Sequence, residues 1–327
     1  MALAYYLIGS VSIIGAIEGF YGPHHAMVGI LAWIGIAILL STPWLFVSNA
    51  RGVLTALLLT SLPPLGLIGW LSPLTAAGVL YPDLGWAGIA FTVAIMMIVP
   101  SIVKMPTRNN VPLLILLLVI AGVSNLMYQG PLAPVGWVGI NTLIRPGGAD
   151  VLASIRNNQA IINSALTRGR GATVLVLPEA VIDQWLPGTQ RQFYDAAQPG
   201  QTWLIGAQTS RFNSVVGIAH GKSSVMTNAA AILPGGNWQP WSTYSLHPAW
   251  WQEIAVIDGK RVWASICVEQ VLPWTWFEAL LQKPDIVLVV SNQWWADPGS
   301  SAPRIQRDSA YAWARLLGVP IVSAINR

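Results

Sequence analysis

The chain has 327 residues, of which 54% are hydrophobic and only 9% are charged, and its mean hydropathy is +0.55. Because a soluble domain usually carries about 25% charged residues, this composition excludes a wholly soluble protein. The net charge of +4 forms no basic stripe with interleaved aromatic residues, which argues against direct nucleic-acid binding. The single cysteine excludes an intramolecular disulfide framework and a cysteine-cluster metal site.

The charged residues divide the chain into two parts. The first 130 residues contain 2 of the 13 acidic and 3 of the 17 basic side chains, and the remainder carries all the others. We therefore predict a membrane domain over residues 1–130 and a globular domain over residues 131–327. A segment rich in Pro and Gly at residues 129–136 links the two.

The membrane domain contains about five apolar segments, each near the roughly 20 residues that cross a bilayer. The first is short and interrupted by Gly9 and Gly15, so a cleaved signal peptide is the alternative; no basic segment precedes it, and we favour a retained span. The expected cores are Leu3–Ile17, Met27–Val47, Val53–Leu71, Trp86–Val103 and Val111–Tyr128.

The few basic residues predict the orientation of these spans, because short cytoplasmic loops collect Lys and Arg. Arg51 lies between the second and third spans, and Lys104 and Arg108 lie between the fourth and fifth. The loops over residues 20–26 and 72–85 contain no Lys or Arg. The globular domain is therefore expected outside, which in a bacterium is the periplasmic side of the inner membrane.

In the globular domain, apolar strands alternate with helical patterns, which is typical of an α/β layered domain. Helices are expected over Asp150–Thr167, Trp274–Gln282 and Arg304–Leu317. Strands are expected near Val135–Leu143, Ala172–Leu177, Trp203–Ala207, Met226–Leu233, Ile254–Ile257, Val262–Cys267, Asp285–Ser291 and Ile321–Ile325. The segment Asn237–Gln252 is rich in tryptophan, so it either contacts lipid, lines an acyl-chain cleft or packs as an ordinary loop.

Reactive or polar residues follow three of the expected strands. Cys267 ends one strand, Glu179 follows a second, and Asn292 and Trp294 follow a third. Each has a structural alternative: free cysteine is often a buried apolar residue, Glu179 can cap a helix, and Asn292 can form a turn. Ligands of open α/β sheets bind outside the carboxyl ends of strands, so we expect these residues to meet in one site. A carboxylate beside a thiol can act as its general base.

The same residues carry a family resemblance. Leu177–Glu179 (LPE), Ser265–Pro273 (SICVEQVLP) and Ser291–Trp295 (SNQWW) resemble the catalytic blocks of the nitrilase, or carbon–nitrogen hydrolase, superfamily. The segment Arg307–Asn326 resembles the family's following block. With membrane spans in front, the chain is most similar to the branch of the apolipoprotein N-acyltransferases and to the TraB-type proteins of conjugative plasmids. The resemblance implies an αββα sandwich.

The resemblance also implies a Glu–Lys–Cys triad that forms a thioester with an acyl group. Glu179 would be the base and Cys267 the nucleophile, while Glu269, Asn292 and Trp294 would shape the pocket. The family's lysine has no counterpart in this chain, because the segment after the strand Met226–Leu233 contains neither Lys nor Arg. Losing one oxyanion donor can cost about 10²–10³ in rate, and His247 is the one local substitute. The chain also stops where the family continues, so we expect a truncated sheet with an unpaired edge.

Two functions of different classes follow from these observations. The first is an acyltransferase or amidase that acts through a cysteine thioester, with a membrane lipid as acyl donor and a lipoprotein or other amine as acceptor. The second is a weakly active or non-catalytic envelope protein that assists conjugal transfer. A transporter is a weaker third interpretation, since no charged residue lies at mid-depth in a span. Thiol chemistry requires no cofactor or metal.

Overall fold

The computed structural model describes residues 1–104, 110–145, 150–219, 222–297 and 299–327. The chain forms two compact units. The helical unit comprises Met1–Pro131, Val271–Lys283 and Ala296–Val319. The sheet unit comprises Leu132–Gln270, Pro284–Trp295 and Pro320–Arg327. The helices expected near residues 274–282 and 304–317 are therefore part of the helical unit.

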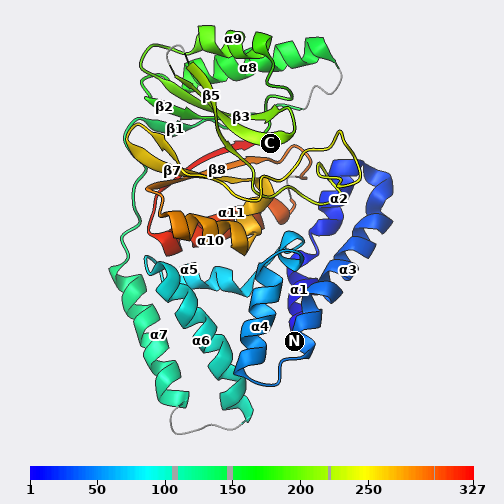
Figure 1. Cartoon of the computed structure of the whole chain (residues 1–327), viewed down its shortest axis with the longest axis vertical. Coiled ribbons are helices and arrows are strands. Elements are labelled where there is room, and N and C mark those ends of the chain that lie inside the picture. Colours follow the sequence, from blue (N-terminus) through cyan, green and yellow to red (C-terminus); the bar gives the residue numbers. More distant parts are fainter. Residues whose placement is uncertain (105–109, 146–149, 220–221, 298) are drawn as a thin grey trace. The chain divides into compact units, whose positions relative to one another are not determined.

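The helical unit begins with apolar helices and ends with two helices from the C-terminal half of the sequence (Figure 1). Its longer helices are α1 (Ala2–Ser10), α2 (Ile13–Tyr21), α3 (Ala26–Leu45), α4 (Ala50–Ser61), α5 (Ala76–Leu80), α6 (Gly85–Lys104), α7 (Asn110–Met127), α10 (Pro273–Gln282) and α11 (Ala302–Leu317). Short 3₁₀ turns at Pro23–His25, Leu65–Leu67 and Pro73–Thr75 connect some of them.

Three segments of the described chain are helical, long and apolar enough to cross a membrane: Ala2–Tyr21, Pro23–Leu45 and Asn110–Met127. A helix pair bent by 119°, Pro73–Leu80 with Gly85–Pro100, brings the number to four if it counts as one span. The expected third span, Val53–Leu71, differs, because α4 has only 12 residues and ends at Ser61. Proline disrupts a helix interior, and Pro63 and Pro64 follow the last residue of α4 after Leu62.

Of the three basic residues in positions 1–130, two lie within the described residues, and both stand toward one end of the helical unit. Arg51 stands in the first turn of α4, and α6 ends at Lys104. Figure 1 shows these helix ends, together with Met1, toward the same end of the unit. Arg108 falls outside the described residues. The membrane side of these helix ends remains a prediction.

The sheet unit contains two sheets. Sheet A has the strand order β1 (Trp137–Gly139), β2 (Val174–Val176), β3 (Thr202–Thr209), β4 (Phe212–Ala219) and β5 (Lys222–Asn228). Sheet B has the order β6 (Ala255–Ile257), β7 (Lys260–Ile266), β8 (Ile286–Asn292) and β9 (Ile321–Asn326). The strands β1, β2 and β3 are parallel in sheet A, and β7, β8 and β9 are parallel in sheet B. The carboxyl ends of β2, β7 and β8 each carry a predicted site residue.

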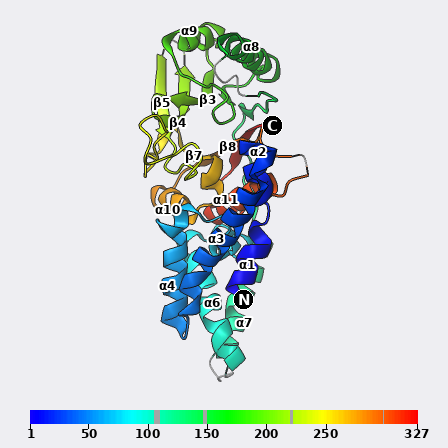
Figure 2. The same ribbon diagram turned by 90° about the vertical axis from the view of Figure 1, so that its right-hand side faces the viewer.

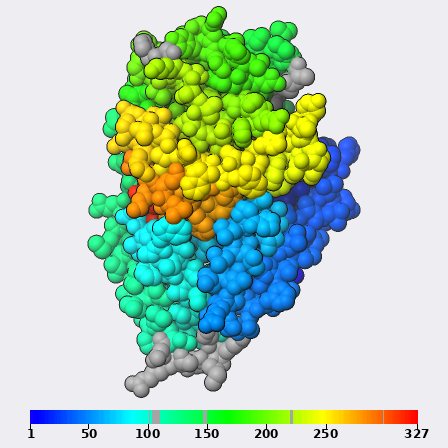
Figure 3. Space-filling model, viewed as in Figure 1, coloured from blue at the N-terminus to red at the C-terminus, as the bar shows by residue number. Residues whose placement is uncertain are grey.

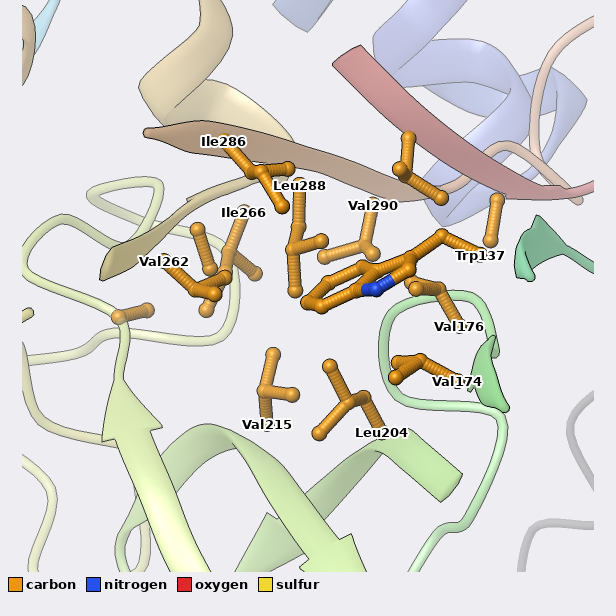
Figure 4. Close-up of a cluster of buried hydrophobic side chains, with 14 of the residues drawn as sticks. Trp137, Val174, Val176, Leu204, Val215, Val262, Ile266, Ile286, Leu288 and Val290 are labelled. Carbon is orange, nitrogen blue, oxygen red and sulfur yellow. The ribbon is translucent and has the colours of Figure 1, made fainter. Parts of the chain in front are cut away.

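The two sheets pack face to face over an apolar core. Figure 4 shows side chains of both sheets meeting there, including Leu204 and Val215 from sheet A and Leu288 and Val290 from sheet B, with Trp137 beside them. A second core lies between sheet A and two helices, α8 (Val151–Arg168) and α9 (Pro187–Ala196). Figures 1 and 2 show these helices over the outer face of sheet A. This layering confirms the predicted α/β class.

Two elements of the sheet unit were missing from the sequence prediction. One is α9, and the other is β4, which forms a hairpin with β3 through a tight turn that has Ser210 at φ +34°. The expected strand Met226–Leu233 was also displaced, because β5 ends at Asn228. A strand that follows its neighbour after only two residues adds no separate loop signal, which is why the run from 202 to 219 gave one expected strand instead of two.

The expectation of an unpaired edge beside the last strand is wrong for residues 325–327. The amide of Thr142 donates to the carbonyl of Ile325, and the amide of Arg327 donates to the carbonyl of Thr142. Asn141 accepts a further hydrogen bond from the amide of Ile325 through its side chain. The segment after β1 therefore covers this part of the edge of β9.

Candidate active site

Cys267 stands directly after β7, at the first residue of a short 3₁₀ turn (Cys267–Val271). Its φ of +53° lies in the left-handed region, which residues other than glycine rarely adopt. Such conformations cluster at active sites, where the surrounding structure holds them. The side chain is partly buried. The turn therefore holds a thiol at the carboxyl end of a buried strand, as the sequence predicted.

Glu179 follows β2 and is 6% exposed. The next residue, Ala180, also has a positive φ, +43°. The backbone of residues 178–179 lies so close to Gly206 of β3 that a Cβ at Gly206 would sit 2.1 Å from the carbonyl oxygen of Pro178. A side chain at position 206 would therefore displace the acid, which explains why glycine is required in the middle of this strand.

The thiol of Cys267 and the carboxylate of Glu179 are hydrogen-bonded to each other. Burial raises the pKa of Glu179, while the hydrogen bonds from Cys267, Asn292 and Asn213 oppose that shift. Burial also raises the pKa of the Cys267 thiol well above its usual value, and the negative charge of Glu179 raises it further. Both shifts favour the protonated form of each group, and the raised pKa makes Glu179 a stronger proton acceptor than an exposed carboxylate.

Two further groups fix the carboxylate of Glu179. Asn213 Nδ2 donates to Oε1 at 2.7 Å, and the backbone amide of Asn292 donates to Oε2 at 2.9 Å. Hydrogen bonds to both oxygens leave the carboxylate one orientation. Strand ends from both sheets, together with β4, therefore build the surroundings of the base.

The side chain of Asn292 belongs to a polar network at the carboxyl end of sheet B. Asn326 Nδ2 donates to Asn292 Oδ1 at 2.8 Å, and Thr142 Oγ1 donates to Asn326 Oδ1 at 2.7 Å. Trp295 Nε1 donates to the carbonyl of Asn292 at 3.0 Å. The side chain of the preceding residue, Trp294, is partly buried. The network holds Asn292 in position, so that its amide can reach Glu179.

Glu269 lies inside the protein, with 0% of its surface exposed. Its Oε2 accepts hydrogen bonds from the amide of Ile266 and from Gln252 Nε2, each at 2.7 Å, and Oε1 accepts one from the amide of Ala231 at 3.1 Å. These contacts tie the end of β7 to two neighbouring segments and so support the turn at Cys267. Its share in shaping a pocket remains a prediction.

None of the described residues that form hydrogen bonds with Cys267 or Glu179 is a lysine. Lys222 and Lys260 are exposed, and each begins a strand, so Lys260 lies at the opposite end of β7 from Cys267. His247 donates its backbone amide to the carbonyl of Arg211. Its Nε2 is buried and has no partner among the described residues, and the ring does not contribute to the bonds of Glu179. A neutral amide, Asn213, is the side-chain nitrogen that contacts the base.

Asn213 was absent from the sequence prediction because its strand, β4, was absent. The available signal was the apolar run from Val215 to Ile218, which follows a polar turn at Ser210. Recognising that hairpin would have placed the side chains of β4 next to β3, but only the fold shows that Asn213 reaches Glu179. Among the described residues, no group of three or more His, Cys, Asp or Glu side chains is arranged to hold a metal ion.

Val268 completes the set of groups around the thiol. Its backbone amide donates to the sulfur of Cys267, which lowers the pKa of the thiol against the larger effect of burial. A backbone donor immediately after the nucleophile can also accept charge that develops on a carbonyl oxygen under attack. The thiol, the carboxylate and this backbone amide therefore lie together at the end of β7.

The chain is similar to two conjugal transfer proteins. It is 30% identical over 290 residues to the conjugal transfer protein TraB of Agrobacterium fabrum, covering 84% of this chain and 66% of that protein. It is 27% identical over 346 aligned residues to the probable conjugal transfer protein TraB of Sinorhizobium fredii, covering 100% of this chain and 87% of that protein. The alignment to the first relative thus spans just under two thirds of its length. No family model matches the chain.

Solved structures of nitrilase-type enzymes are also similar. A carbon-nitrogen hydrolase from Helicobacter pylori aligns with a TM-score of 0.41 and 15% identity, covering 53% of this chain and 68% of that one. An amidase from Nesterenkonia sp. aligns with a TM-score of 0.42 and 15% identity, covering 60% and 80%. The TraB relatives and the three motif blocks together support grouping the chain with the TraB-type conjugal transfer proteins, and these blocks resemble the catalytic blocks of the nitrilase superfamily.

Proposed function

We propose that this protein transfers or hydrolyses acyl groups through a thioester on Cys267, with Glu179 as general base. The observation that carries the proposal is the hydrogen bond between the two side chains at strand ends, with Cys267 held at φ +53°. A buried thiol used only for packing needs neither a carboxylate partner nor a strained backbone. The positive φ costs about 1–3 kcal/mol, and both features are explained if the thiol reacts.

The chemistry follows from the groups around the sulfur. Glu179 accepts the thiol proton as the sulfur forms a bond to the carbonyl carbon of the donor, and the carbonyl oxygen becomes an oxyanion near the amide of Val268. Collapse of this intermediate breaks the bond to the leaving group, which takes the proton from Glu179. Water or an amine then attacks the thioester, Glu179 accepts its proton, and the thiol is restored.

Membrane attachment supports a lipid as the acyl donor. At least three helices of the described chain are long and apolar enough to span a bilayer, and a protein held there meets phospholipid esters at high local concentration. We propose that the sheet unit works on the periplasmic side, as the positions of Arg51, Lys104 and Arg108 predict. The acceptor would be an amine, such as that of a lipoprotein, or water.

The neutral amide of Asn213 in contact with the base predicts a slow enzyme. Without a cation, neither the thiolate nor the oxyanion receives charge stabilisation from a side chain, and the loss of one such donor costs about 10²–10³ in rate. Acyl adducts should therefore accumulate over long incubations and at alkaline pH, where the thiolate is more populated.

The test is intact-protein mass spectrometry of the detergent-purified chain after incubation with phospholipid. Wild type should gain one acyl mass that hydroxylamine removes, whereas Cys267→Ala and Glu179→Gln should gain none. An adduct that persists in Cys267→Ala would place the acylation elsewhere. A folded wild type that stays unmodified at every pH between about 7 and 10, where thiols ordinarily ionise, would refute the thioester.

The names of the relatives and the missing lysine favour a second candidate. In this alternative the protein is a component of conjugal transfer that keeps the fold without using the thiol. A mating assay separates the two. Under the second candidate, plasmid transfer falls when the whole protein is deleted but survives Cys267→Ala. Under the first candidate, both changes reduce any plasmid transfer that requires the enzyme's activity.

A further inference from the structure

A slot of about 360 Å³ opens beside α7 in the helical unit. Its apolar wall includes Val119, Val123 and Met127, which follow one another along about 12 Å of α7 at 1.5 Å per residue. The other wall is the turn between α5 and α6, at residues 82–84. Figure 1 shows α7 beside α6, with α5 near one end of both helices. The slot therefore runs lengthwise along a helix that is long and apolar enough to cross a membrane.

The polar groups of the slot gather where α7 ends. Tyr128 directly follows the candidate span Asn110–Met127, and tyrosine favours the membrane–water boundary. One turn earlier, Ser124 Oγ donates to the carbonyl of Pro82 at 2.8 Å, which fastens the opposite wall to this end of the helix. Val119, in contrast, lies near the middle of the span. The slot thus has a polar end at the depth of lipid headgroups and an apolar wall that extends toward the bilayer centre.

A fixed cation stands at this polar end. Cζ of Arg315, from α11, lies 4.7 Å from the centre of the Tyr128 ring, and Nη2 donates to Asn125 Oδ1. Asn125 is held in turn, because its Nδ2 donates to the carbonyl of Leu80 at 2.8 Å. Arg315 is partly exposed, and among the described residues no carboxylate forms an ion pair with it. A ring and a neutral amide therefore position this guanidinium without an acidic partner.

A purely structural role explains part of this arrangement. A basic residue in the last turn of a helix interacts favourably with the helix dipole, and Arg315 stands in the last turn of α11 and joins it to α7. That role explains neither the open slot beside the cation nor the direction in which its apolar wall extends. A cation at headgroup depth with an apolar slot leading inward matches the two chemical parts of a phospholipid.

We propose that this slot holds one phospholipid, with an acyl chain along α7 and its phosphate hydrogen-bonded to the guanidinium of Arg315. Arginine is suited to this task because its planar fork of N–H donors binds phosphate oxygens. The lipid is a bound ligand that joins α11 to α7, and it is separate from any acyl donor. Every residue of the slot and Arg315 belong to the helical unit, so the inference does not rest on the proposed chemistry of Cys267.

The test is native mass spectrometry of the full-length Cys267→Ala protein in detergent, in which the thiol cannot consume lipid. The protein is titrated with phosphatidylethanolamine and with a diacylglycerol that has the same acyl chains but no phosphate. Phosphatidylethanolamine is chosen because its net charge of zero avoids general attraction to a chain of net charge +4, and its ammonium group suits Asp83 on the wall of the slot.

The first phosphatidylethanolamine should bind about tenfold tighter than the diacylglycerol, as one charge-assisted hydrogen bond predicts. Arg315→Gln should remove this preference, whereas Arg315→Lys, which keeps the charge, should retain part of it. Val123→Trp places a large side chain on the wall of the slot, so it should weaken the binding of both lipids.

Arg51→Gln and Leu118→Trp are the matched controls. Arg51 is a basic residue in the first turn of α4, and Leu118 is an exposed residue of α7 that does not line the slot. Both variants should keep the affinities of the parent protein. Equal affinities for the two lipids, a preference that persists in Arg315→Gln, or binding that is unchanged in Val123→Trp would overturn the proposal. Melting temperatures measured in parallel show that each variant is folded.

Discussion

Replacing Gly206 with alanine is expected to move Glu179 away from Cys267 while leaving every side chain of the site unchanged. The new Cβ would lie 2.1 Å from the carbonyl oxygen of Pro178 and 2.5 Å from the Cα of Glu179, both of which are backbone atoms. Real Cβ contacts essentially never fall below 3.0 Å, so β3 and this segment must separate by about 0.9 Å, which is 3.0 less 2.1. A displacement of about 1 Å at a reacting group can cost about 10²-fold in rate.

Overpacking of this kind also costs about 1–3 kcal/mol of stability. The assay follows the thermal unfolding of the full-length protein and, at a temperature where it stays folded, the rate of thioester formation on Cys267. Gly217→Ala on β4 is the control, because its Cβ would meet only Leu204 Cδ2 at 3.7 Å, an ordinary contact. Gly206→Ala with the stability and acylation rate of this control would refute the reasoning.

Three further predictions concern charge and packing. Glu179→Gln removes the negative charge that raises the pKa of the Cys267 thiol. Alkylation by iodoacetamide, followed by mass spectrometry, should therefore reach half its maximal rate at a lower pH than in wild type. A shift of this half-maximal pH to a higher value would contradict the prediction. Glu269→Gln leaves at least one of three buried donors facing an amide nitrogen. The melting temperature should therefore fall by an amount equivalent to about 1–3 kcal/mol. An unchanged melting temperature would count against a stabilising role for the Glu269 carboxylate. Gly78→Ala in α5 would place a Cβ 1.7 Å from a backbone oxygen of α11, whereas nothing lies within 4 Å of a Cβ at Gly122. Gly78→Ala should therefore destabilise the helical unit in detergent by about 1–3 kcal/mol relative to the control Gly122→Ala. Equal melting temperatures of the two variants would refute this packing.

The elements that the sequence predicted best are those with strong local signals. The strands β7, β8 and β9 are apolar runs next to polar ends, and α10 and α11 each have a proline in the first turn, where it favours a helix. Weaker signals were missed. The second strand of the β3–β4 hairpin lacked a separating loop, and α4 ended early at consecutive prolines where hydropathy alone suggested a full span.

The surface loop at residues 237–252 illustrates the limit of composition. Tryptophan content predicted either a lipid contact, an acyl-chain cleft or ordinary packing. In the structure, Trp241 and Tyr244 are 78% and 97% exposed, and the yellow segment of Figure 3 that contains the loop lies on the face shown. Gln252 at its end is buried and bonded to Glu269. One loop therefore has both an exposed aromatic tip and an anchored base, which composition could not separate.

The sequence by itself determined that the chain has an apolar helical part and an α/β part, and that Glu179, Cys267 and Asn292 follow buried strands. Those features depend on local hydrophobic patterns and on the residues at strand ends. Only the tertiary structure decided which of these groups touch. Asn213 contacts the base because the β3–β4 hairpin folds back beside β2, and Glu269 accepts hydrogen bonds from three buried donors. The hydrogen bonds of the site join residues up to 184 positions apart, and so wide a separation leaves no local signal in the sequence.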